Sequence, residues 1–245
     1  MTVKRRVAGR LQGPTGLYIR PDAARLLGLT PATLRRWVDG YTYALQDQRS
    51  DDRSRRSIAP VLRPSLPVFG QVVALTFHEL MELRVVKEIV DKGVSLRHVR
   101  AAANLASRRF KTPHPFASRR VFTDGNHIFS ALHDFVDAPN VVKWTPDEID
   151  QVIAGPIFEQ FLSEIEFDDA SSLAQRWWPR GRAVPVTLDP KIRFGSPVVS
   201  GTGVTTAAVA SIARASSVRA AAVAYEIDER SAQAAVDFEK SLNSA

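Results

Sequence analysis

The feature that most constrains the fold of this chain is a pair of short helical patterns between residues 18 and 38, joined by a tight turn. Gly28 provides a stop for the first helix. Thr30 provides an N-cap for the second helix, and Pro31 takes its favoured first position. In residues 31–38 the apolar side chains recur at i, i+3 and i+4, so one face of the second helix is expected to be buried. Two such helices with so short a turn predict a helix-turn-helix motif.

The opposite face of the second predicted helix carries Thr33, Arg35 and Arg36. A recognition helix reads base edges in the major groove with side chains of this kind, and nearby cations neutralise phosphates. The stretch 41–67 is poorly periodic and typical of an exposed wing. Its arginines are the expected phosphate contacts, and they are Arg49, Arg53, Arg55 and Arg56.

A helix-turn-helix pattern is short and also occurs in ordinary helical packing, so the charge distribution matters. The net charge is +7, but residues 1–63 hold 13 Lys and Arg against 5 Asp and Glu. Residues 139–190 hold 4 Lys and Arg against 9 Asp and Glu. A basic first quarter attached to an acidic middle predicts a polyanion as the partner of one end and another task for the rest.

Two further helices are predicted after the wing. The segment 75–90 has the strongest helical periodicity in the chain, and Thr76 and Glu79 have the spacing of a capping box. Ser95 is expected to cap a helix that ends at about Arg109.

The periodicity then changes toward that of strands. Residues 118–122 and 127–131 flank an Asp-Gly-Asn turn and predict a β-hairpin. Residues 152–162 favour a helix. Residues 163–167 and 173–178 predict a second hairpin.

The C-terminal segment begins with a predicted strand pair, residues 184–188 and 197–200, and then becomes helical. Three helices are expected over residues 207–215, 218–224 and 229–242, and the last two have a second helix-turn-helix outline. The exposed face of the last helix is not net basic. A protein or dimer contact is therefore at least as well supported as DNA binding at this end.

These patterns together predict an α+β, mainly helical fold. It has a winged helix-turn-helix at the N-terminus, a β-hairpin-rich middle and a small helix-turn-helix-like domain at the C-terminus. The expected boundaries are 1–74 for the DNA-binding region, 75–112 for a helical pair that completes the N-terminal domain, 113–186 for the middle and 187–245 for the C-terminal domain.

Signatures of catalysis and cofactor binding are weak. The chain has no cysteine, which excludes disulfides and cysteine-ligated zinc. The segment His78-Glu-Leu-Met-Glu82 resembles a zinc-protease helix but has Glu where the second histidine is needed. The acidic residues between 147 and 169 are expected to form a solvated face. We therefore expect no enzyme, no catalytic residues, no metal and no cofactor.

No apolar run is long enough for a membrane span, and the basic first ten residues lack the apolar core of a signal peptide. These features predict a soluble, cytoplasmic protein with no membrane partner.

Residues 18 to about 110 resemble a known DNA-binding fold. The segments Ala23-Ala-Arg-Leu-Leu-Gly28, Thr33-Leu-Arg-Arg-Trp-Val38 and Gly93-Val-Ser-Leu-Arg-His-Val-Arg100 look like the MerR-type winged helix. Residues 187–240 have Phe194-Gly-Ser-Pro-Val-Val199 and Gly201-Thr-Gly-Val-Thr-Thr206. They resemble the small domain-of-unknown-function family numbered four hundred and thirty-three. The combination is similar to VapB-type antitoxins of a two-domain kind.

That resemblance implies an antitoxin of a type II toxin–antitoxin system. Such a protein would neutralise a PIN-like ribonuclease toxin by direct binding and regulate its own operon on operator DNA, as a homodimer. The alternative is a stand-alone MerR-like transcription regulator, which a neighbouring toxin gene would argue against. Because a metal-dependent ribonuclease site is rich in carboxylates, basic and aromatic residues of the C-terminal half are the candidate toxin contacts. They are Arg176, Trp177, Trp178, Arg180, Arg182 and Arg193.

Overall fold

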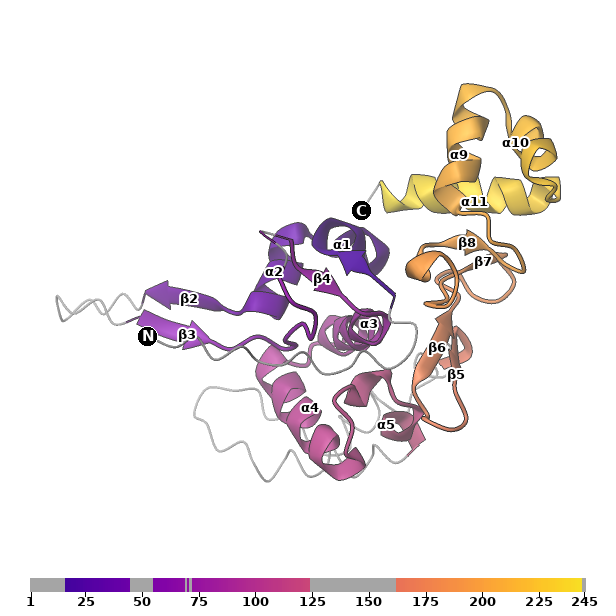
Figure 1. Ribbon diagram of the computed structural model, residues 1–245. Coiled ribbons are helices and arrows are strands. Elements are labelled where there is room, and N and C mark those ends of the chain that lie inside the picture. Colours follow the sequence, from indigo (N-terminus) through magenta and orange to yellow (C-terminus); the bar gives the residue numbers. More distant parts are fainter. Residues whose placement is uncertain (1–15, 45–54, 69, 71, 124–161, 244–245) are drawn as a thin grey trace.

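The structure is a computed structural model that describes residues 16–44, 55–68, 70, 72–123 and 162–243. Helices and small strand pairs alternate along the chain (Figure 1), and about half of the described residues are helical. Within the described ranges the strands form four two-stranded antiparallel sheets. None of the described helices combines the length and the apolar character that crossing a membrane requires.

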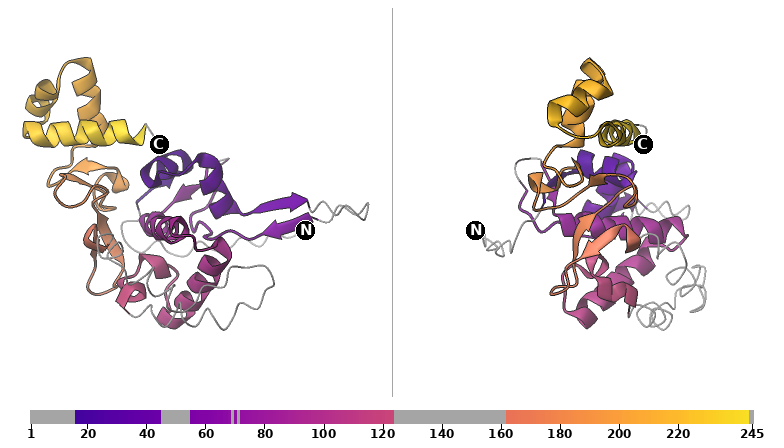
Figure 2. Two further views of the ribbon diagram at one scale, coloured as in Figure 1. Left: turned by 180° about the vertical axis from the view of Figure 1, so that it is seen from behind. Right: turned by 90° about the vertical axis from the view of Figure 1, so that its right-hand side faces the viewer.

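The N-terminal elements confirm the predicted helix pair and add a hairpin after it. The strands β2 and β3 form an antiparallel hairpin that projects away from the helices in the views of Figures 1 and 2, while β1 pairs with β4. These elements are β1 (Tyr18–Ile19), α1 (Arg20–Leu27), α2 (Pro31–Asp39), β2 (Tyr41–Ala44), β3 (Arg55–Ile58) and β4 (Ala74–Leu75).

The central helix α3 (Phe77–Asp91) is buried along most of its length, in agreement with its predicted periodicity. The predicted capping box is present: Thr76 Oγ1 accepts a hydrogen bond from the backbone N–H of Glu79 at 3.2 Å, and the Glu79 carboxylate accepts one from the N–H of Thr76 at 2.7 Å. The next helix, α4 (Leu96–Phe110), begins at its predicted cap, Ser95.

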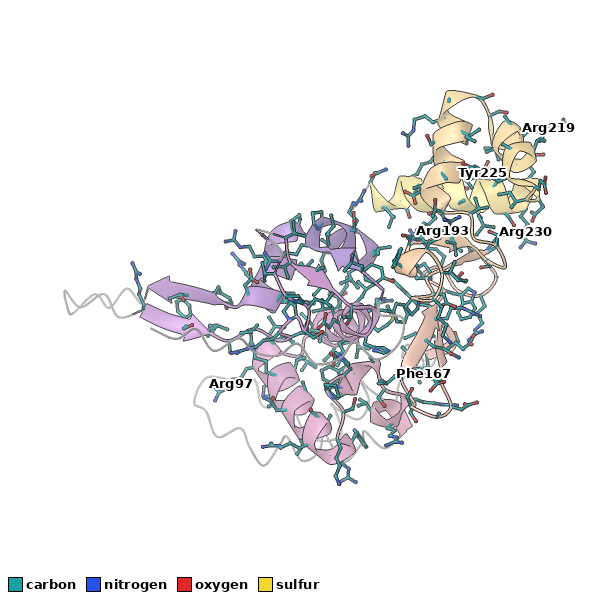
Figure 3. All side chains as sticks on the ribbon, viewed as in Figure 1. Arg97, Phe167, Arg193, Arg219, Tyr225 and Arg230 are labelled. Atoms are coloured by element: carbon teal, nitrogen blue, oxygen red, sulfur yellow. The ribbon has the colours of Figure 1, made fainter. Side chains whose placement is uncertain are left out.

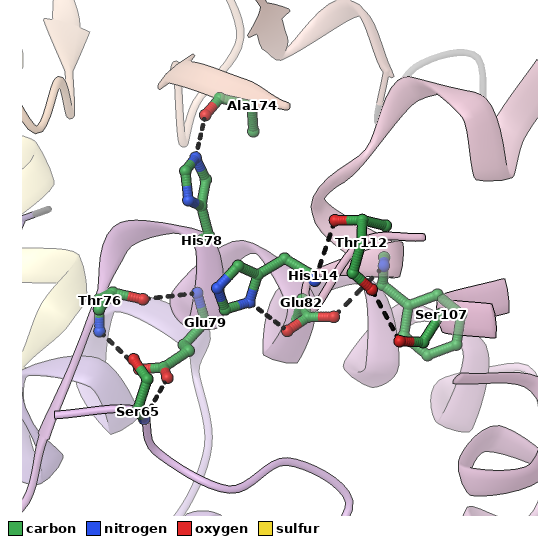
Figure 4. Close-up of polar contacts among 10 residues, drawn as sticks. Ser65, Thr76, His78, Glu79, Glu82, Ser107, Thr112, His114 and Ala174 are labelled. Carbon is green, nitrogen blue, oxygen red and sulfur yellow. Dashed lines mark hydrogen bonds and ion pairs between the residues drawn. The ribbon is translucent and has the colours of Figure 1, made fainter. Parts of the chain in front are cut away.

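A network of buried polar side chains explains the histidine and glutamates of α3 (Figure 4). His114 Nδ1 lies 3.0 Å from the Glu82 carboxylate, and His78 Nε2 lies 3.1 Å from the carbonyl oxygen of Ala174. Burial raises the pKa of Glu82. Burial lowers the pKa of His114, but the hydrogen bond and charge of Glu82 outweigh it and leave that pKa raised. The described residues contain no group of three or more His, Asp or Glu arranged to hold a metal ion.

The predicted strand over residues 118–122 is wrong. A single 3-10 turn, η1 (Pro115–Ala117), leads instead into the short helix α5 (Arg119–Thr123). In a strand, one of the two adjacent arginines would point into the core, whereas the helix leaves both exposed and buries Val121. Residues 127–131 and most of 152–162 lie outside the described residues.

The predicted second hairpin and the predicted C-terminal elements are confirmed. Helices α9, α10 and α11 begin at the N-caps Thr205, Ser217 and Asp228, each of which accepts a hydrogen bond from a backbone N–H three residues on. The elements are β5 (Ile165–Phe167), β6 (Ala174–Trp177), β7 (Val186–Thr187), η3 (Arg193–Gly195), β8 (Val198–Val199), α9 (Thr206–Ala215), α10 (Val218–Tyr225) and α11 (Glu229–Leu242).

Two hydrophobic clusters form the core. The larger one extends along the chain from Tyr18 to Leu188 and is built around α3, with Phe77 and Trp177 among its largest fully buried side chains. The smaller one joins the three C-terminal helices through side chains that are mostly alanine. These helices form a separate lobe next to β7 and β8 (Figures 1 and 2).

Two hydrogen bonds connect the start of the chain to the turn η3. The N–H of Leu17 donates to the carbonyl oxygen of Phe194 at 2.9 Å, and the buried Tyr18 hydroxyl donates to that of Gly195 at 2.8 Å. Because β1 leads directly into α1, the helix-turn-helix and the C-terminal half share this contact.

Candidate nucleic-acid interface and partner surface

The turn between α1 and α2 has the geometry that its sequence predicts. Gly28 is left-handed (φ 61°, ψ 38°), and its N–H closes the end of α1. Thr30 Oγ1 accepts a hydrogen bond from the N–H of Thr33 at 3.1 Å. The apolar face of α2 is buried through Leu34, Trp37 and Val38, so this face fixes the orientation of the helix on the core. The opposite face of α2 is therefore directed toward solvent.

Of the three predicted readers, Arg35 and Arg36 are exposed and Thr33 is partly buried. The Arg35 side chain is 76% exposed, and its Nε lies 3.9 Å from a carboxylate oxygen of Asp39, a separation that leaves the guanidinium free to turn outward. The hydroxyl of Thr33 lies 2.8 Å from that of Thr30, so it belongs in part to the cap. The two arginines are the residues that α2 presents for contact.

The wing carries aromatic side chains next to α2. Tyr41 and Tyr43 are exposed on β2, their ring centroids lie 6.2 Å apart, and the Arg36 guanidinium lies 5.8 Å from the Tyr41 ring centroid. The expectation of an irregular wing did not predict that these two tyrosines lie on a strand. The alternation Tyr-Thr-Tyr is the sequence signal for a strand with both rings on one face.

The arginines expected in the wing are described only in part. Arg55 is exposed at the start of β3, and the backbone of Arg56 pairs with that of Tyr43. Arg49 and Arg53 lie outside the described residues.

A cation of α4, Arg100, also belongs to this region and is not predicted from the helix-turn-helix pattern. Its Nε and Nη2 atoms are buried and have no hydrogen-bond acceptor among the described residues. Burial lowers the pKa of this guanidinium, and the proximity of Tyr41 opposes the shift. The charge of this guanidinium adds to the positive potential near the wing, which favours a polyanion such as DNA.

The candidate toxin contacts divide into buried and exposed residues. Trp177 is 2% exposed and belongs to the core, and Trp178 is 9% exposed. The Arg182 guanidinium stacks 4.0 Å from the Trp178 ring centroid, and that of Arg176 lies 5.6 Å from it on a hairpin strand.

Arg176 is further held by acidic partners. Its Nη2 lies 2.9 Å from Asp189 Oδ2, and its Nη1 lies 3.4 Å from Glu166 Oε2. The residues of the set with exposed side chains are Arg180, Arg182 and Arg193. A partner approaching this half of the chain would therefore meet these three arginines first.

Comparison with protein families finds no model that matches the chain. In sequence, the chain is 26% identical over 203 residues to a Mycobacterium tuberculosis protein described as "Putative antitoxin VapB45". That match covers 79% of this chain and 80% of the relative, and it supports the resemblance to VapB-type antitoxins.

In structure, the chain is similar to the crystal structure of Rv2018 from Mycobacterium tuberculosis. The TM-score is 0.67 at 25% sequence identity, and the match covers 90% of this chain and 97% of that one. The similarity in fold therefore extends over most of both chains. The MerR-type resemblance and that of the C-terminal family stay predictions.

Proposed function

We propose that this chain is the antitoxin of a type II toxin–antitoxin pair, that it acts in the cytoplasm without being an enzyme, and that it neutralises a PIN-like ribonuclease by direct binding. The observation that carries this proposal is the similarity, over about four fifths of both chains, to the protein described as "Putative antitoxin VapB45". In this proposal residues 1–74 and 75–112 serve DNA, and residues 113–186 and 187–245 serve the toxin.

The DNA part of the proposal rests on α2 and the wing. Arg35 and Arg36 would contact base edges, while Arg49, Arg53, Arg55 and Arg56 would contact phosphates. A homodimer would place two copies of α2 on a palindromic operator, because the symmetry of the protein matches that of the site.

The DNA part is tested by titrating a DNA duplex from the promoter of this chain at several salt concentrations. Loss of a bidentate base contact in Arg35→Ala or Arg36→Ala is expected to cost about 1–3 kcal/mol and to relax sequence preference. Arg214→Ala, on α9, is the control for a general loss of positive charge. Unchanged affinity in both α2 variants would place the readout elsewhere.

The antitoxin part is tested by co-expression with the protein encoded beside this chain. Relief of growth arrest, together with a complex that co-purifies, is the expected result. If the neighbour is not toxic, or if its toxicity persists and no complex forms, the antitoxin proposal fails and the stand-alone regulator takes its place.

A further inference from the structure

The turn η3 holds three successive residues in the left-handed region, at φ 47° for Arg193, 55° for Phe194 and 82° for Gly195. Only the glycine adopts this conformation without steric cost, because the Cβ of the other two crowds the backbone. Strain of this kind persists where the surroundings impose it, and it occurs preferentially at sites of function. Here the hydrogen bonds from Leu17 and Tyr18 to the carbonyl oxygens of Phe194 and Gly195 hold the turn in place.

The strained turn displays an aromatic side chain to solvent. Phe194 is 79% exposed, the largest fraction among the exposed large hydrophobic residues of the described chain. Its backbone carbonyl oxygen is tied to the N–H of Leu17, so the ring projects from a rigid base. A rigid, exposed aromatic residue is the typical anchor of a protein interface, because little conformational entropy is lost when a partner covers it.

A groove of about 420 Å³ lies beside Arg193, the residue before Phe194, between the turn and the C-terminal helices. Arg193 and Tyr225 come to it from η3 and α10 (Figure 3). Arg193 Nε donates to the carbonyl oxygen of Gly203 at 3.0 Å, which orients the guanidinium while its two terminal nitrogens form no ion pair with any described residue. The lining residues are Arg193, Gly203, Val204, Thr205, Ala208 and Tyr225.

The chemistry of the groove indicates what it can accept. The lining contains one cation and no carboxylate, and the rest of its surface comes mainly from Val204, Ala208 and the Tyr225 ring. An apolar groove with one guanidinium suits an apolar side chain adjacent to a carboxylate. Glu226 and Glu229 are exposed near the groove, so selectivity for an acidic occupant depends on Arg193 itself.

We propose that Phe194 and this groove form the docking site for an acidic surface segment of the toxin. The inference rests on the proposed antitoxin function and assigns the surface that carries it out. A carboxylate of the segment pairs with Arg193, a neighbouring apolar side chain enters the groove beside Tyr225, and Phe194 is covered by the partner.

The test uses the full chain and the purified ribonuclease encoded beside it, with affinity measured by calorimetry and rescue measured by co-expression. Phe194→Gly is expected to weaken binding about 30-fold or more, as for loss of an interface hot spot. Because glycine relieves the strained backbone, the same variant is expected to keep or raise the melting temperature. Arg193→Gln is expected to weaken binding about tenfold and to reduce its salt dependence.

Val223→Ser is the matched control. Val223 is 73% exposed on α10, and two residues before Tyr225 it points to the other side of the helix. The affinity of the Val223→Ser variant for the ribonuclease is expected to stay within about twofold of the wild type, as for an energetically neutral position. If Phe194→Gly and Arg193→Gln bind as the wild type does, or if the control loses as much, the docking site is refuted and the antitoxin function stands. If the wild type itself does not bind, both fail.

Discussion

Tyr18→Phe tests whether the contact between β1 and η3 stabilises the whole chain. The Tyr18 side chain is 3% exposed, and its hydroxyl donates to the Gly195 carbonyl oxygen at 2.8 Å across 177 residues of sequence. Phenylalanine keeps the ring but leaves that buried oxygen without its donor. This change is expected to lower the free energy of unfolding by about 1–3 kcal/mol. For a chain of this length each kcal/mol corresponds to about 2–4 °C of melting temperature. A loss of about 2 kcal/mol would thus lower it by about 4–8 °C.

Thermal and urea unfolding followed by circular dichroism measure this loss. Tyr225→Phe is the control, because that tyrosine makes no hydrogen bond through its hydroxyl to any described residue, and its stability is expected to change by less than about 0.5 kcal/mol. Gly195→Ala is expected to cost more than Tyr18→Phe, since its Cβ would lie 2.1 Å from the tyrosine hydroxyl at a φ of +82°. Equal melting temperatures for Tyr18→Phe and the wild type would refute the reasoning. So would a double variant, Tyr18→Phe with Gly195→Ala, whose loss of unfolding free energy equals the sum of the two single losses.

Three other changes have definite expected outcomes. Arg100→Ala should reduce the slope of log affinity for promoter DNA against log salt by about one if its guanidinium binds a phosphate; an unchanged slope contradicts this. Thr76→Ala removes one half of the capping box and should lower the free energy of unfolding by about 0.5–2 kcal/mol in urea titrations; no change would mean that the cap is dispensable. Burial lowers the pKa of His114, but Glu82 raises that pKa by more, so the net shift is upward. The charged pair therefore contributes stability that is fully present below the ordinary histidine pKa and is lost as the pH rises through the raised pKa. His114→Gln should therefore destabilise more near pH 6 than near pH 9, and a loss independent of pH would show that the pair is not charged.

Local signals predicted much of the fold. Helix starts at Thr30, Thr76 and Asp228 follow from side chains that cap backbone N–H groups within three residues, so the sequence contains the whole interaction. The prediction failed at Ser118, where the choice between strand and helix depends on which side of Arg119 and Arg120 faces the core. That information lies in the packing against α3 and α4 rather than in the segment.

The candidate site was predictable to a similar extent. The amphipathic spacing of α2 predicts that Arg35 and Arg36 face solvent. It contains nothing about Arg176. The ion pair of Arg176 with Glu166 crosses the β5–β6 hairpin, whereas its ion pair with Asp189 forms only when the segment after β7 packs beside that hairpin. The exposure of Phe194 is likewise set by a contact with residues near the other end of the chain.

The Tyr18 contact also has a consequence for the order in which the protein is made. A ribosome releases the helix-turn-helix first, but the acceptors for Leu17 and Tyr18 belong to residues 194 and 195. At about 5–20 residues per second, the N-terminal elements wait roughly ten to thirty seconds for them. A nascent chain, or one cut before η3, can therefore pair β1 with β4 but lacks the two hydrogen bonds that attach β1 to η3. A chain that ends before residue 194 would carry α1 and α2 without this support, so we expect its helix pair to be less stable than that of the full chain.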